Sequence, residues 1–139
     1  MNGGELTRTA SGLSNQHLLY GVDCVAYVEG GLDHPHPIAS ALNGSDETLD
    51  AAFWSAIFDV VVPEKTFHVK SIGSRRTVEA LAIIVAQDKL KNIVVCTDSD
   101  VHGAVRSHLA MPPIAKTWGY NWENDICNPD VLACVFRRL

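Results

Sequence analysis

The sequence lacks the spacings that mark common zinc and disulfide sites. Its four cysteines form no CxxC pair, and its histidines, among them His34, His36 and His102, show no HExxH or paired Cys/His arrangement. Cys24 and Cys96 instead lie within apolar runs, where a cysteine serves as a small core residue. Reduced thiols and a cytoplasmic location are therefore expected.

Long apolar runs and excess positive charge are also missing. No stretch approaches the roughly 18 apolar residues that span a bilayer, so no membrane partner is expected. Residues 1–16 are polar and lack a signal-peptide core, which predicts a flexible N-terminal segment before a single domain at 17–139. The net charge of -5 excludes a general attraction to nucleic acid, so such contact would need a local basic patch or a bridging metal.

Strand-like and helix-like patterns alternate along the chain. Strands are predicted at 22–28, 66–70, 93–96 and 114–117, and helices from Ser45, from Ser74, over 101–110 and from Pro129. With 139 residues and 47% hydrophobic content, the chain is long enough to bury a core. The alternation predicts an α/β fold, a three-layer α/β/α Rossmann-like arrangement with a mainly parallel four-stranded sheet.

Three of the predicted helices have an apolar side that should face inward. For the helix from Ser45 this side comprises Leu49, Ala52, Phe53, Ala56, Ile57 and Val60. For the helix from Ser74 it comprises Val78, Leu81, Ala82, Val85 and Ala86. The last helix presents Val131, Leu132, Val135 and Phe136, through which a homodimer is a further expectation.

Carboxylates follow two of the predicted strands. Asp98 and Asp100 come directly after the strand at 93–96, and Glu29 follows the first strand. The carboxyl ends of parallel strands meet at one edge of a sheet, so these side chains can converge if the two strands are neighbours. Converging carboxylates repel one another unless a cation lies between them, and Mg²⁺ or Mn²⁺ prefers such oxygen ligands. The prediction is a catalytic metal site, with Glu29 alternatively a general base; the competing interpretation is a solvated acidic loop.

Two arginines open the helix that follows the second strand. Arg75 and Arg76 would lie beside the carboxyl end of that strand, where helix N–H groups and arginine forks bind phosphate well. The alternative is an ordinary solvated helix face.

Three segments together resemble a known family. Val28-Glu29-Gly30-Gly31-Leu32-Asp33 and Val94-Val95-Cys96-Thr97-Asp98-Ser99-Asp100 resemble the two acidic motifs of the Toprim (topoisomerase–primase) domain. Tyr120-Asn121-Trp122-Glu123-Asn124 resembles the Y-x-x-E-N segment of the branch related to overcoming-lysogenization-defect nucleases. The resemblance implies a Mg²⁺-dependent site that cuts or joins DNA or RNA, with an acidic core of Glu29, Asp98 and Asp100. It also implies Asp33 and Glu123 as further metal ligands, and a role as an effector in anti-phage defence.

The sequence departs from this family in ways that leave other functions open. The loop from Gly30 to Ser45 is longer than expected, and no Walker A motif accompanies the domain. A separate ATPase partner, or a longer protein of which this chain is a fragment, would account for the missing motif. One alternative is a non-catalytic sensor or docking module that works with that ATPase. A haloacid-dehalogenase-like phosphatase with Asp98 as nucleophile is another, although its DxD motif normally closes the first strand.

Overall fold

The computed structural model describes residues 10–34, 36–98 and 114–116, together with residues 123, 129 and 130. The predicted helix at 101–110, and nearly all of the predicted last helix with its homodimer surface, lie outside these residues. In the part of the chain that is described, no helix has the length and apolar character needed to cross a bilayer.

A parallel sheet with the strand order β2-β1-β3-β4 forms the centre of the fold. The strands are β1 (Cys24–Val28), β2 (Phe67–Ser71), β3 (Ile93–Thr97) and the short β4 (Ile114–Lys116). Each observed strand overlaps a predicted one, and the predicted α/β class with parallel strands is confirmed. Because β1 and β3 are direct neighbours, the residues that follow them emerge side by side at one edge, here called the carboxyl edge.

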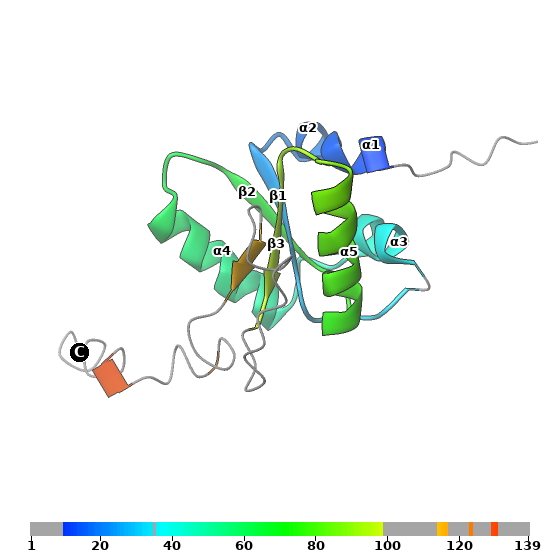
Figure 1. Cartoon of the computed structure of the whole chain (residues 1–139). Coiled ribbons are helices and arrows are strands. Elements are labelled where there is room, and N and C mark those ends of the chain that lie inside the picture. Colours follow the sequence, from blue (N-terminus) through cyan, green and yellow to red (C-terminus); the bar gives the residue numbers. More distant parts are fainter. Residues whose placement is uncertain (1–9, 35, 99–113, 117–122, 124–128, 131–139) are drawn as a thin grey trace, which may run out of the picture.

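Alternate residues of the central strand β1 build two separate cores. Val25 and Tyr27 belong to a cluster with α5 (Arg75–Gln87) and α3 (Pro37–Asn43), whereas Ala26 and Val28 belong to a cluster with α4 (Leu49–Val61). Successive side chains of a strand point to opposite faces, so one strand, buried from Val25 to Val28, supplies both clusters. Figure 1 shows the result, with α4 on one side of the sheet and α5 and α3 on the other.

The inward side of α5 agrees with the prediction, and that of α4 does not. Val78, Leu81, Ala82 and Val85 of α5 are buried. In α4, however, Ala51, Trp54 and Phe58 are the buried residues. Most of the predicted inner side faces outward, with Leu49 75% and Val60 79% exposed and both Ala52 and Ala56 exposed. The helix is apolar on nearly every side, so its periodicity does not define a unique inner face, and the two large aromatic rings take the core positions.

Three short helices occur where the sequence predicted none. α1 (Ala10–Ser14) and α2 (Gln16–Tyr20) lie across the end of the predicted flexible segment, and Leu13 is fully buried in the core. α3 begins at Pro37 within a stretch expected to be loop. Its first turn is capped by His36 Nδ1, which accepts a hydrogen bond from Ile38 N at 3.2 Å. Proline suits this first helical position because its missing N–H would have no partner there.

Candidate functional site

The carboxyl edge brings together Glu29, which follows β1, and the end of β3. Glu29 Oε1 accepts a hydrogen bond from Thr97 Oγ1 at 2.6 Å and another from Asp98 N at 3.1 Å. Thr97 is 2% exposed, whereas Glu29 and Asp98 are partly exposed to solvent. The predicted convergence of Glu29 with the start of the acidic pair therefore has a direct physical basis, since the carboxylate is anchored to the neighbouring strand.

The chain leaves Glu29 through a turn that only glycine fits. Gly30 and Gly73 exchange two backbone hydrogen bonds, with N···O distances of 2.8 and 2.6 Å, and have φ angles of 107° and 113°. A Cβ on Gly30 would lie 2.7 Å from Asp50 Oδ2, and one on Gly73 would overlap Asp33 Oδ1. The loop after β1 is thus closed tightly onto the loop after β2.

Asp33, expected to bind metal, bonds to the beginning of α5. Its Oδ1 accepts hydrogen bonds from Ser74 N at 2.7 Å and from Thr77 Oγ1 at 2.6 Å. These bonds, the Thr77 hydroxyl first and the Ser74 N–H second, lower the pKa of Asp33 below its ordinary value. Ser74 occupies the predicted cap position but makes no side-chain cap bond, and Asp33, from a distant part of the chain, bonds to its N–H instead.

The two arginines of α5 have different surroundings. Arg75 Nε donates to Glu79 Oε1 at 2.8 Å, one turn along the helix. Arg76 is exposed and lines a polar hollow of about 490 Å³ with Asp33, His34, Pro37, Ser74, Thr77 and Ala80. Of the two predicted phosphate contacts, Arg76 is the more exposed and is the one that lines this hollow.

The donor set suits a hard cation but is incomplete in the described part of the chain. Glu29 and Asp98 offer carboxylate oxygens, the ligands that Mg²⁺ and Mn²⁺ prefer. Among the described residues, no group of three His, Cys, Asp or Glu side chains could hold a metal ion. Asp100, the predicted third ligand, lies outside those residues. Glu123 is described and exposed, and is not part of such a group.

Sequence reasoning missed three residues at this edge. Thr97 orients Glu29, Thr77 holds Asp33, and Asp50 lies against Gly30. A signal existed for Thr97, because a polar residue that ends an apolar strand beside a candidate acid is placed to bond with it. No local pattern indicated the other two, since their contacts depend on how α4 and α5 pack onto the sheet.

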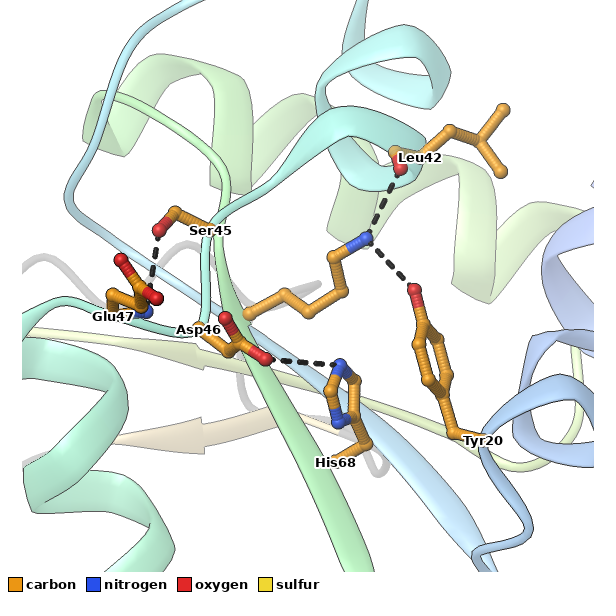
Figure 2. Close-up of polar contacts among 7 residues, drawn as sticks. Tyr20, Leu42, Ser45, Asp46, Glu47 and His68 are labelled. Atoms are coloured by element: carbon orange, nitrogen blue, oxygen red, sulfur yellow. Dashed lines mark hydrogen bonds and ion pairs between the residues drawn. The ribbon is translucent and has the colours of Figure 1, made fainter.

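A second polar cluster surrounds the buried Lys70 of β2. Lys70 is 4% exposed, and its Nζ donates to Leu42 O at 3.0 Å and to Tyr20 Oη at 3.2 Å (Figure 2). The Tyr20 ring stacks on the His68 ring at a centroid distance of 3.7 Å. Nε2 of His68 lies 3.9 Å from Oδ2 of Asp46. Leu42 O belongs to the last turn of α3, so Lys70 caps the carbonyl end of that helix and joins it to α2 and the sheet.

Comparisons with family models, with curated proteins and with solved structures find no match for this chain.

Proposed function

We propose that the chain is a metal-dependent nuclease of the Toprim type, which cleaves phosphodiester bonds in DNA or RNA. One observation carries the proposal: Glu29, after β1, is hydrogen-bonded to Thr97 and to the Asp98 amide, at the end of the neighbouring parallel strand β3. This juxtaposition supports the arrangement implied by the family resemblance. A role in anti-phage defence follows from the same resemblance and belongs to the proposal.

The proposed site would use carboxylate oxygens from Glu29, Asp98 and Asp100. A bound Mg²⁺ or Mn²⁺ would stabilise the negative charge that develops on the phosphate, and it would lower the pKa of a water molecule bound to it. Thr97 holds Oε1 of Glu29 in a fixed position at the strand end, so the carboxylate needs little reorganisation to act. Glu123 remains a proposed additional ligand.

Substrate contact at this edge would depend on Arg76 more than on Arg75. The Arg75 guanidinium is paired with Glu79, and the N–H of Ser74, the residue before α5, is bonded to Asp33. Arg76 instead lines the polar hollow beside the loop that follows Glu29. A guanidinium there can bind a phosphate of the substrate backbone with paired hydrogen bonds.

Cleavage of plasmid DNA and of tRNA with Mg²⁺ or Mn²⁺ tests the proposal. Replacing Glu29→Gln or Asp98→Asn should lower the cleavage rate by about 100-fold or more, because each removes a charged oxygen ligand. Asp59→Asn, an exposed change in the last turn of α4, is the matched control and should keep the wild-type rate. Wild-type rates in both Glu29→Gln and Asp98→Asn would refute the nuclease assignment.

A non-catalytic docking module that works with a separate ATPase is the second candidate. The outward side of α4 favours it, since Leu49, Val60 and Val61 are 75%, 79% and 67% exposed. Exposed apolar stripes of this kind often mark interaction surfaces. Calorimetric titration separates the two functions: absence of Mn²⁺ binding at millimolar concentration, together with absence of cleavage, would favour docking.

A further inference from the structure

We infer that Asp33 is a positioning residue, which locks the loop after β1 onto α5 and thereby holds Glu29 at the carboxyl edge. This role replaces the metal-binding role that the family resemblance implies for Asp33. Its catalytic consequence rests on the proposed function, whereas its structural part stands on the hydrogen bonds alone.

Asp33 joins two segments that are far apart in sequence. Its Oδ1 accepts hydrogen bonds from Ser74 N and Thr77 Oγ1, which lie 41 and 44 residues along the chain. An N-cap normally comes from the residue that precedes the helix, but the Ser74 side chain makes no such bond. Asp33 therefore ties the Ser74 amide and the Thr77 hydroxyl, at the two ends of the first turn of α5, to the loop after β1.

Backbone contacts around Asp33 add two more links between the same loops. Gly30 and Gly73 donate to each other's carbonyl oxygens. Their positive φ angles allow this close approach, and an added Cβ on Gly73 would collide with the Asp33 carboxylate. The Asp33 bonds and the glycine bridge together form what we call the loop clasp, made of Gly30, Asp33, Gly73, Ser74 and Thr77.

The loop clasp begins one residue after Glu29. Two consecutive glycines with positive φ, Gly30 and Gly31, give this segment wide conformational freedom unless other contacts fix it. The Glu29 side chain is bonded to β3 on one side, and the clasp fixes the backbone on the other. Small displacements of a catalytic group reduce rates strongly, so loosening the clasp should affect catalysis at Glu29.

Metal binding by Asp33 fits the described geometry less well. Glu29, Asp33 and Asp98 are all described, yet they do not form a group of three that could hold a metal ion. Asp33 bonds to the beginning of α5, whereas Glu29 bonds to the amide of Asp98, beside a second carboxylate. The Oδ1 of an asparagine can accept the same two bonds, whereas alanine cannot, and this difference separates the two roles.

The test compares Asp33→Asn, Asp33→Ala and Asp23→Ala in Mn²⁺-dependent cleavage, Mn²⁺ titration and thermal unfolding. Asp23 is the matched control, because it makes a similar interaction with Thr66 at the opposite edge of the sheet. Both alanine variants should lower Tm by about 3 °C. Only Asp33→Ala should lower kcat, by about 10-fold when measured well below Tm, with KM and Mn²⁺ affinity within about twofold of wild type. Asp33→Asn should restore kcat and Tm to near wild type.

Two results would overturn the inference. The first is an Asp33→Asn variant that loses Mn²⁺ affinity as Glu29→Gln does, which would make Asp33 a ligand. The second is an equal loss of kcat in Asp33→Ala and Asp23→Ala, which would show that the clasp contributes only to the stability of the fold. If the wild-type chain cleaves nothing, the proposed function fails, and amide exchange at Gly30 and Ser74 then decides on the clasp itself. Faster exchange in Asp33→Ala but not in Asp33→Asn supports it, and unchanged exchange in both refutes it.

Discussion

The two edges of the sheet use the same chemistry for different purposes. At the amino edge, Asp23 Oδ2 accepts from Thr66 N at 2.8 Å and from Thr66 Oγ1 at 2.9 Å, and these bonds tie the beginnings of β1 and β2 together. At the carboxyl edge, Asp33 accepts from an amide and a threonine hydroxyl at the beginning of α5. Both aspartates join the flanks of the same two strands, but only Asp33 lies in the loop that follows Glu29.

The two edges also differ in the size and lining of the hollows beside them. The amino edge has the larger one, about 540 Å³, lined by Ser14, Asn15, His17, Asp88, Lys89, Leu90, Lys91 and Asn92. It lies beyond the carbonyl end of α5, and Lys89 and Lys91 are part of its lining. The smaller hollow, about 490 Å³, lies beside the polar carboxyl-edge loops. Size alone therefore does not indicate the site, and the position of the carboxylates is the stronger guide.

Removing one threonine hydroxyl at each edge would sharpen this comparison most. Thr97→Val deletes the donor to Glu29, and Thr66→Val deletes the equivalent donor to Asp23. We expect Thr97→Val to lower the proposed cleavage activity by about 10-fold, because Glu29 loses its orientation. The same change should cost about 1 kcal/mol in the free energy of unfolding, measured with urea. Thr66→Val should reduce stability while keeping kcat unchanged, and a similar loss of kcat in both variants would contradict the assignment of the site to one edge.

A smaller effect is expected from the two arginines at the carboxyl edge. Arg76→Gln should raise KM for the nucleic-acid substrate about threefold to tenfold and reduce the salt dependence of binding, because one phosphate contact is lost. Arg75→Gln is the matched control, since the Arg75 guanidinium is paired with Glu79. Binding measured over a range of salt concentrations distinguishes the two. Equal effects of the two substitutions would show that its position in the hollow gives Arg76 no special role in phosphate binding.

The smallest effect is a shared dependence of stability on acid pH. Hydrogen bonds lower the pKa of Asp23 and of Asp33 below the ordinary value of an aspartate, with Thr66 and Thr77 as the largest causes. The unfolded chain then binds protons at a higher pH than the folded one, so the stabilisation present above about pH 4 is lost as the pH falls through the folded-state pKa. Urea unfolding can be measured between pH 5 and 2.5, limits that lie about one unit on either side of the ordinary aspartate pKa. The free energy of unfolding should fall less over this range in Asp23→Asn and in Asp33→Asn than in wild type. An unchanged pH profile in either variant would contradict the role of that aspartate.

Sequence patterns predicted the structure correctly wherever a local pattern of apolar residues was compatible with only one arrangement. The buried runs at β1 and β3 required strands, and the separated apolar positions of α5 required one inner face. Glu29 and Asp98 could be expected at the same edge because both follow parallel strands, and the pairing of β1 with β3 then brought them into contact. Their metal chemistry stays a prediction, since Asp100 lies outside the described residues.

Tertiary structure decided the features that no local pattern defined. α4 is apolar on most sides, so packing of Trp54 and Phe58 chose its inner face. Asp33 acquired its partners from the beginning of a helix 41 residues away, and Arg75 is paired with Glu79. The sequence by itself therefore determined the strands, the helices α4 and α5 between them and the acids at the strand ends. Long-range packing and hydrogen bonding determined which of the polar residues support the fold and which remain available for chemistry.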